Sequence, residues 1–242
     1  MIRAALIGNP NVGKTEIFNR LTRRSQRVGN FPGVTVEKTS GRLMHKGKEI
    51  EVMDLPGIYS LTASSVDEIV ARDYIIEERP DVIVDVVDGI NLERNLYLTL
   101  LLLEMDANLV IALNRWDMVN SRGLKINVER LSKIIGCPVV PTVAVTGDGL
   151  EDLKDSIVDV AEQKKTNDRS VVQNYGDDIE HLIKKVESVI KESPRVAERY
   201  SARWLAIKLL EGDENILEMM KASMSYSHIS KILDIIDAGE VQ

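Results

Sequence analysis

The sequence predicts an α/β domain with a doubly wound, mostly parallel sheet, followed by a small all-α helical domain. Apolar runs rich in β-branched residues alternate with segments of helical spacing up to about residue 163, and such alternation is typical of parallel strands joined by right-handed helical crossovers. Beyond residue 176 only helical spacing remains. We therefore expect the first domain at residues 1–165 and the helical domain at residues 166–242, with a polar linker over Lys164 to Gly176.

Six segments are expected as strands. Continuous apolar runs, which suit strands covered on both faces, occur at Val82–Val87, Leu109–Leu113 and Val139–Thr142. A shorter run occurs at Arg3–Ile7. The pair Gly41–His45 and Glu49–Asp54 flanks Lys46-Gly47-Lys48 and predicts a hairpin.

The predicted helices fill the intervals between these strands and the whole of the second domain. In the first domain they begin at about Lys14 and cover Val66–Glu78, Asn91–Met105, Val128–Ile134 and Leu150–Gln163. In the second they cover Ile179–Lys191, Pro194–Leu210, Glu214–Ser223 and Ser227–Ile236. Pro194 suits the first turn of a helix and Gly212 suits the position after a helix end.

The composition bounds the class of protein. The 242 residues carry a net charge of −7, whereas a nucleic-acid-binding domain usually has a basic face, so no nucleic-acid partner is expected. The single cysteine, Cys137, has no partner for an internal disulfide, which favours a cytoplasmic location. The most apolar run, Leu96–Leu103, is far shorter than the ~20 residues of a membrane helix. Met1 leads directly into a strand, so no signal peptide is expected.

A phosphate-binding loop is the first chemical motif. Gly8-Asn9-Pro10-Asn11-Val12-Gly13-Lys14-Thr15 has two glycines, a lysine and a hydroxyl at the required spacing, between a predicted strand and a predicted helix. Its backbone N–H groups can cradle phosphate oxygens, helped by the positive end of the helix. Lys14 can neutralise the terminal phosphates, and the Thr15 hydroxyl is a ligand for Mg²⁺. We include Glu16, the next residue, in the expected nucleotide site.

An Asn-x-x-Asp motif predicts that the base is guanine. Asn114-Arg115-Trp116-Asp117 directly follows the predicted strand Leu109–Leu113, and ligands of open α/β sheets bind at the carboxyl ends of strands. The Asp117 carboxylate can accept hydrogen bonds from guanine N1–H and from its exocyclic amine, a donor pair that adenine lacks. A second match, Asn174 to Asp177, lies in the polar linker and is interpreted as a chance occurrence.

A third motif predicts the remaining Mg²⁺ ligands. Asp54-Leu55-Pro56-Gly57 ends the predicted strand Glu49–Asp54. An aspartate there can hold Mg²⁺ through water, and the glycine N–H can sense the γ-phosphate. Thr35, in the loop after the first helix, is the candidate that completes the Mg²⁺ shell, with Thr39 as a rival.

The order of these motifs resembles that of the translation-factor-like GTPases, which have a phosphate-loop α/β fold. Several segments are closer still to the cytoplasmic part of ferrous iron transport protein B. They are Gly8–Thr15, Asn30–Val36, Asp54–Leu61, Val70–Tyr74, Val86–Asp88 and Asn91–Leu96. This resemblance implies a GTP-hydrolysing regulatory domain, with GTP or GDP, Mg²⁺ and K⁺ bound.

The resemblance also implies further site residues and partners. It adds Gly33 and Val34 to the nucleotide site, with Val143 and Ala144 beside the base. Catalysis would rest on Asn11, Lys14, Thr35 and Gly57, and the Asn11 side chain would help to bind K⁺. The second domain would be a helical spacer, similar to a nucleotide-dissociation inhibitor. A membrane permease region would follow it, placing the chain on the cytoplasmic face of the cell membrane, and any oligomer would form through that membrane part.

Some positions depart from the pattern of these GTPases. Arg115 replaces the usual Lys or Met, and its stem could still lie along the purine. Val143 replaces a serine, which leaves the Ala144 N–H as the contact to guanine O6. Asp85 lies where an asparagine is usual. Ile58 occupies the position where small GTPases carry a water-orienting glutamine, so hydrolysis is expected to be slow unless K⁺ supplies the missing stabilisation.

Three classes of function are compatible with the motifs. A regulatory GTPase coupled to a ferrous-iron permease is the first. A GTPase of ribosome assembly or tRNA modification would need a basic RNA-binding appendage, whereas the predicted helical domain alternates acidic and basic residues. A nucleotide-sensing module with negligible turnover is the third. A transition-metal site is not expected, because His45, His181, His228 and Cys137 are scattered, and Met219 to Met224 suits core packing.

The helical domain has no glycine-rich anion loop, so we expect it to act on the nucleotide state indirectly. The segment Ile58 to Tyr74 follows the γ-phosphate-sensing glycine and should reorder when that phosphate leaves. A domain that prefers one state of this segment changes nucleotide affinity by linkage.

Overall fold

The computed structural model describes residues 1–22, 26–62, 65–162 and 174–240. It forms two compact units, one of Met1–Leu103 with Ala107–Val171 and one of Glu104–Asp106 with Val172–Gln242. The predicted domain boundary at residues 165 and 166, and most of the predicted linker, lie outside the described residues.

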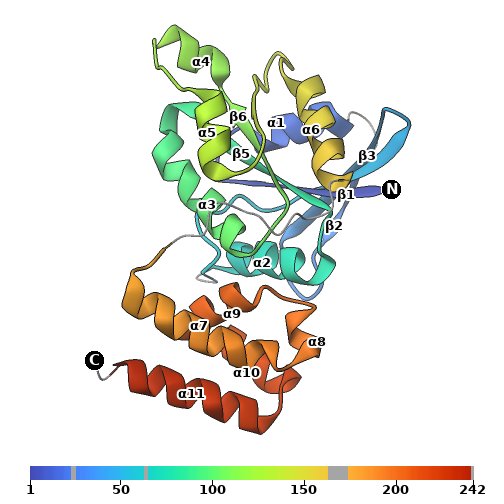
Figure 1. The fold of residues 1–242 in the computed structure, drawn as a ribbon. Coiled ribbons are helices and arrows are strands. Elements are labelled where there is room, and N and C mark those ends of the chain that lie inside the picture. The colour runs from blue at the N-terminus through green and yellow to red at the C-terminus, as the bar shows by residue number, and fades with distance from the viewer. Residues whose placement is uncertain (23–25, 63–64, 163–173, 241–242) are drawn as a thin grey trace. The chain divides into compact units, whose positions relative to one another are not determined.

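The first unit is built on a seven-stranded sheet in the order β2-β3-β4-β1-β5-β6-β7 (Figure 1). Its strands are β1 (Ile2–Gly8), β2 (Gln26–Asn30), β3 (Glu37–His45), β4 (Lys48–Asp54), β5 (Val82–Asp88), β6 (Leu109–Asn114) and β7 (Val139–Pro141). Strands β4, β1, β5, β6 and β7 run parallel, while β2 and β3 add an antiparallel edge. The predicted doubly wound, mostly parallel sheet is therefore confirmed.

The β3–β4 hairpin forms where the sequence predicts it. Lys46 and Gly47 both have positive φ, 48° and 75°, which is the geometry of a two-residue turn that matches the twist of the strands. The sequence missed β2, because all five of its residues are exposed and it has no apolar period.

Helices cover both faces of the sheet. They are α1 (Lys14–Thr22), α2 (Val66–Glu78), α3 (Leu92–Glu104), α4 (Trp116–Ser121), α5 (Val128–Ile135) and α6 (Leu150–Glu162), with the short helix η1 (Gly89–Asn91) before α3. Apolar side chains of α1 and α6, among them Phe18 and Ile157, pack with Leu6, Val84 and Ala112 of the sheet into one buried core. Because α3 bonds to Asp85, whose side chain points the other way from Val84, it covers the opposite face.

The second unit is entirely helical. It contains α7 (Asp177–Lys191), α8 (Pro194–Ala197), α9 (Ala202–Leu210), α10 (Glu214–Ser223) and α11 (Tyr226–Glu240). The expectation of one helix over Pro194–Leu210 was wrong. Ser201 adopts an extended conformation and its hydroxyl accepts the N–H of Trp204 at 3.3 Å, so it caps a new helix.

An apolar core and one ion pair hold this unit together. Ile183 and Ile190 of α7, Leu205 of α9 and Ile232 of α11 are fully or almost fully buried. Arg203 donates two hydrogen bonds to the Glu180 carboxylate, at 2.6 and 2.9 Å, in the bidentate geometry that gives such pairs their specificity.

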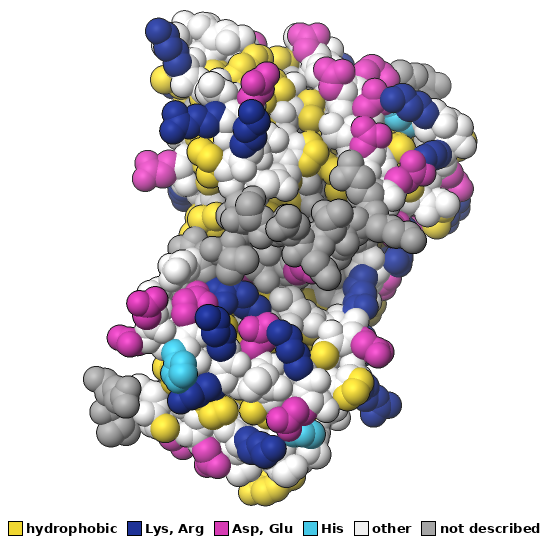
Figure 2. Space-filling model, in the orientation of Figure 1, with side chains coloured by type: hydrophobic (Ala, Val, Ile, Leu, Met, Phe, Trp, Pro, Cys, Tyr) yellow, Lys and Arg dark blue, Asp and Glu magenta, His cyan; other side chains and the backbone are white. Residues whose placement is uncertain are grey.

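Two surface properties bear on the class of protein. None of the helices in the described part of the chain is long and apolar enough to cross a membrane. On the face seen in Figure 2, lysine and arginine side chains are interspersed with aspartate and glutamate rather than gathered in one basic patch.

Candidate nucleotide site

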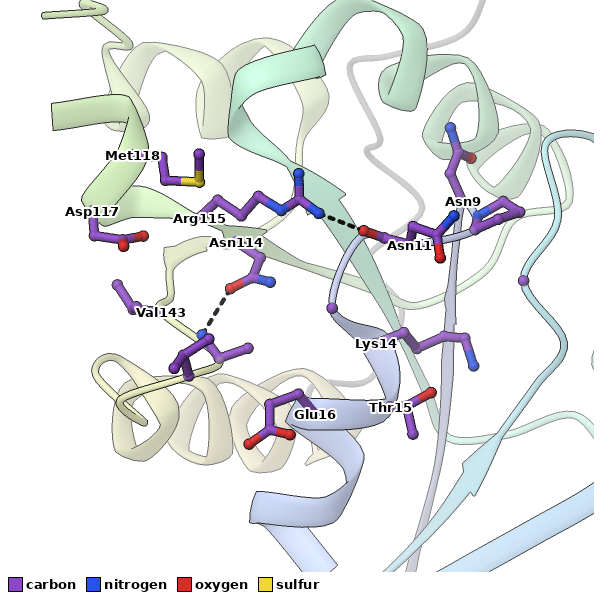
Figure 3. Close-up of a pocket in the computed structure, with 15 residues that line it drawn as sticks. Asn9, Asn11, Lys14, Thr15, Glu16, Asn114, Arg115, Asp117, Met118 and Val143 are labelled. Carbon is purple, nitrogen blue, oxygen red and sulfur yellow. Dashed lines mark hydrogen bonds between the residues drawn. The ribbon is translucent and has the colours of Figure 1, made fainter. Parts of the chain in front are cut away.

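A cavity of about 750 Å³ opens at the carboxyl edge of the sheet, and Figure 3 shows the side chains that line it. Four segments contribute: the loop between β1 and α1 with the start of α1, the loop after β4, the end of β6 with the start of α4, and the loop after β7. The lining residues are Asn9, Pro10, Asn11, Gly13, Lys14, Thr15, Glu16, Gly57, Asn114, Arg115, Asp117, Met118, Val143, Ala144 and Val145. The fold thus brings together two motifs that lie a hundred residues apart, at the edge where open α/β sheets bind ligands.

The loop from Gly8 to Lys14 has the shape that the sequence predicts. A Cβ at Gly8 would lie 2.6 Å from the Val86 carbonyl oxygen, and one at Gly13 would lie 2.3 Å from Asn114 Nδ2. Only glycine therefore fits at either position. Lys14 and Thr15 form the first turn of α1, so the helix points its positive end at the cavity.

Asn114 joins the phosphate loop to the loop after β7. Its Nδ2 donates to the Val12 carbonyl at 2.7 Å, and its Oδ1 accepts the N–H of Ala144 at 2.9 Å. The side chain is 2% exposed. Asn114 is therefore a structural hub of the cavity.

Ala144 lies at the cavity, but its N–H is engaged by Asn114. The predicted contact between this N–H and guanine O6 would need the hydrogen bond to be shared, and it stays a prediction. The neighbouring residue Val145 also lines the cavity, which the sequence analysis missed.

Arg115 acts through its guanidinium. Its backbone is left-handed, with φ of 62°. Nη2 donates to the Asn11 carbonyl at 2.6 Å, and Nη1 donates to Asp88 Oδ2 at 3.0 Å (Figure 3 shows the first bond). Asp88 is 4% exposed and also caps η1. The arginine thus ties the motif after β6 to the phosphate loop, an ion pair that the sequence analysis did not foresee.

Asp117 and Met118 complete the end of the cavity opposite Lys14 (Figure 3). The Asp117 carboxylate has no hydrogen-bond partner in the described part of the chain, so both oxygens can accept from a ligand. Met118, which follows the motif directly, offers an apolar surface that was not predicted.

Lys14 and Asp54 place opposite charges side by side. The Lys14 ammonium contacts Asp54 Oδ1, and both side chains are nearly nine-tenths buried. Burial raises the pKa of the Asp54 carboxyl, and the neighbouring Lys14 opposes the rise.

The Thr15 hydroxyl makes no hydrogen bond within the described residues. The neighbourhood of Gly57 is tight, since a Cβ there would lie 3.3 Å from Pro10 Cα.

Other predicted site residues do not line the cavity. Thr35 and Gly33 are exposed in the loop before β3, with Val34 between them. Thr39, the rival of Thr35, pairs with Asp54 in the sheet and donates to Glu37 at 2.9 Å. Four further predicted site residues lie in the backbone around the cavity without lining it: Gly8, Val12, Leu55 and Pro56.

Ile58 is 2% exposed and donates its N–H to the Gly8 carbonyl at 3.1 Å, so its side chain packs in the core.

Asp85 is a buried carboxylate behind the site. Its Oδ2 accepts the Thr99 hydroxyl at 2.6 Å, and the residue is 1% exposed. Burial raises its pKa from 3.8 to about 7, and the bond from Thr99 opposes the rise. A protonated Asp85 has nearly the shape of asparagine, which gives a physical reason why aspartate is accepted at this buried position.

Comparison with known proteins identifies the family. The model of ferrous iron transport protein B matches residues 2–157, and that of the FeoB cytosolic helical domain matches residues 175–240. The chain belongs to the ferrous iron transport protein B family. Among curated FeoB relatives, the Fe(2+) transporter FeoB of Methanocaldococcus jannaschii is 49% identical over 232 residues, covering 96% of this chain and 34% of the relative. That of Escherichia coli K12 is 42% identical over 212 residues, covering 86% and 26%.

Solved FeoB structures match the whole chain. A GDP-bound mutant of S. thermophilus NFeoB has a TM-score of 0.85 at 44% identity and covers 100% of this chain and 90% of that one. The GMPPNP form of the T. maritima FeoB cytosolic domain has a TM-score of 0.85 at 38% identity, covering 99% and 97%. The fold is thus the phosphate-loop G domain of FeoB followed by its helical domain. The chain spans only about a quarter to a third of the curated FeoB transporters.

Proposed function

We propose that this chain binds and hydrolyses GTP and is the regulatory G domain of a membrane ferrous-iron transporter. The observation that supports it best is the cavity with Lys14 at one end and Asp117 at the other, where Asn114 bonds the phosphate loop to the loop after β7. A phosphate loop with a lysine suits a nucleoside triphosphate. A carboxylate without a protein partner suits the donor edge of guanine.

The polar groups at the phosphate end fit Mg²⁺. Thr15 and Asp54 supply the hydroxyl and carboxylate oxygens that this ion prefers, and Thr35 would join them from its exposed loop. Bound there with the phosphates, Mg²⁺ would neutralise charge that develops on the transferred group. Lys14 contacts Asp54 in the structure, and in the complex we assign it to the terminal phosphates, where its charge stabilises the leaving group.

We infer that hydrolysis is slow and is stimulated by K⁺. Ile58 is buried and apolar, so it cannot orient water, and the Gly57 N–H is the polar group left beside the γ-phosphate position. Asn11 has φ of 65°, lines the cavity, and its side-chain amide has no partner in the described residues. This amide oxygen is therefore available to a monovalent cation, which would act as a charge stabiliser in place of an arginine.

The membrane part of the proposal rests on the relatives. The Fe(2+) transporters that match are about three to four times as long as this chain. We propose that a membrane permease region accompanies the chain at the cytoplasmic face of the cell membrane, and that any oligomer forms through that region. The proposal includes no nucleic-acid partner, and the family match disfavours a ribosome-assembly role.

Phosphate release from GTP and ATP tests the enzymatic proposal. The full chain with Mg²⁺ should release phosphate from GTP and not measurably from ATP. Lys14→Ala should abolish GTP turnover, while Lys125→Ala, an exposed lysine on the segment before α5, should not. Equal turnover of both nucleotides, or GTP turnover that survives Lys14→Ala, would contradict the proposal.

A further inference from the structure

The loop between β7 and α6 is held in shape by its own hydrogen bonds. Val143 donates its N–H to the Asp148 carbonyl at 3.0 Å, and Gly147 donates to the Val143 carbonyl at 2.8 Å. Thr146 Oγ1 donates to Asp148 Oδ2 at 2.8 Å. This loop also carries Val143, Ala144 and Val145, which line the base end of the cavity.

Arg20 of α1 donates hydrogen bonds to this loop and does not line the cavity. Its Nη1 donates to the Thr146 carbonyl at 3.3 Å, and its Nη2 donates to the Val145 carbonyl. The third donor, Nε, bonds to Glu16 Oε1 at 3.0 Å. All three nitrogens of the planar guanidinium are therefore used, and Glu16 fixes its orientation.

The loop and the guanidinium are in close contact. A Cβ at Gly147 would lie 3.2 Å from Arg20 Nη1, and Gly147 has φ of 91°, so glycine both allows the turn and leaves room for the arginine. Arg20 is two turns along the helix whose first turn presents Lys14 and Thr15 to the cavity. The helix α1 thus carries Lys14 and Thr15, which line the cavity, and also Arg20, which bonds to the β7–α6 loop.

We propose that Arg20 is a positioning residue for the bound guanine nucleotide, which slows its release by holding the β7–α6 loop against α1. This inference rests on the proposed function, because it requires the nucleotide to bind in this cavity. The residue touches no ligand itself. Within the described residues, the Val145 and Thr146 carbonyls accept hydrogen bonds from Arg20 and from no other donor. Without Arg20 the Val145 and Thr146 carbonyls would turn to water, and the loop could open while the phosphates remain bound.

Release of a fluorescent methylanthraniloyl-GDP from the full chain, chased with excess GDP, tests this. Arg20→Met keeps the aliphatic stem and removes every donor. Because the Arg20 side chain is partly exposed and its charge is screened, we expect release to be about five to ten times faster. Association and single-turnover hydrolysis should stay within about twofold, since the phosphate end is untouched. Arg20→Lys, whose compact ammonium reaches one carbonyl, should release about two to five times faster.

Arg42→Met is the matched control, because Arg42 is a similarly exposed arginine that pairs with Glu49 and Glu51 on β4. It should release nucleotide at the wild-type rate. Wild-type release from Arg20→Met, with an unchanged melting temperature, overturns the inference. If Arg20→Met does not fold, Arg20→Lys decides in the same way. Failure of the wild type to bind the fluorescent nucleotide would instead refute the proposed function.

Discussion

The side-chain nitrogen of Asn114 donates to the backbone carbonyl of Val12 over 2.7 Å, across 102 residues of sequence. Asn114, the last residue of β6, therefore bonds to the phosphate loop through Nδ2 and to the loop after β7 through Oδ1. Both ends of the nucleotide site depend on one buried amide.

Asn114→Asp should damage the site and the fold together. The substitution replaces the N–H donor by a carboxylate oxygen that faces the Val12 carbonyl in a buried position, which costs on the order of 3 kcal/mol. Thermal unfolding and GDP affinity by calorimetry should both fall. Asn120→Asp, on the exposed side of α4, is the control. An Asn114→Asp protein with wild-type affinity would show that this hub is dispensable.

Asp117→Asn should change which base is bound. The carboxylate accepts from the N1–H and amine of guanine, and the loss of a charged double contact costs roughly 3 kcal/mol or more. An asparagine can donate to the 2-oxo group of xanthine, so binding of xanthosine triphosphate should rise as GTP binding falls. Competition against a fluorescent nucleotide measures both, with Asp152→Asn of α6 as the control. If the variant prefers GTP as the wild type does, Asp117 does not read the base.

Asn11→Ala should remove the stimulation of hydrolysis by K⁺. In the wild type we expect GTP turnover in K⁺ to exceed that in Na⁺ by about tenfold, from one added charge stabiliser. Because the Asn11 carbonyl, and not its side chain, bonds to Arg115, nucleotide binding should largely survive the change. Asn120→Ala should keep the K⁺ effect. Stimulation that persists in Asn11→Ala would place the cation elsewhere.

Asp85→Asn should raise stability at neutral and alkaline pH. Since burial raises the pKa of Asp85 from 3.8 to about 7, the folded state binds more protons than the unfolded state between these values. The free energy of unfolding therefore falls as pH rises through this window, by an amount on the order of a few kcal/mol. Urea unfolding at about pH 5 and about pH 8 should show the wild type losing more stability than Asp85→Asn. Parallel pH profiles would mean that Asp85 ionises without cost.

Removal of the helical unit should change the rate of GDP release. By linkage, a domain that prefers one state of the segment Ile58 to Tyr74 shifts nucleotide affinity, typically by about 1–3 kcal/mol. The comparison is between the full chain and residues 1–165, with circular dichroism confirming that the shorter protein is folded. Identical release and affinity would make the helical unit a spacer only.

Local pattern was enough for the larger elements and for the chemistry of the motifs. The apolar period of α2 and α10 predicted both helices with their observed bounds, because helix burial repeats over a few residues. The phosphate loop could be found from eight consecutive residues, because a Cβ at either of its glycines would clash with neighbouring atoms, so the loop requires glycine there. By contrast, β2 has no apolar period, and Ser201 begins a new helix within a stretch of helical spacing through a single hydroxyl.

The sequence by itself determined the α/β class, the helical second part, the phosphate loop, and the aspartate expected to read guanine. Only the tertiary structure decided which long-range hydrogen bonds hold the site and the sheet behind it. They join Arg115 to Asp88 and Asn11, Thr99 to Asp85, and Arg20 to the β7–α6 loop. The physical reason is separation along the chain. Arg20 and the Thr146 carbonyl are 126 residues apart, and neither carries a local pattern that points to the other. Such contacts exist because strand order and helix placement bring unrelated segments to one edge of the sheet.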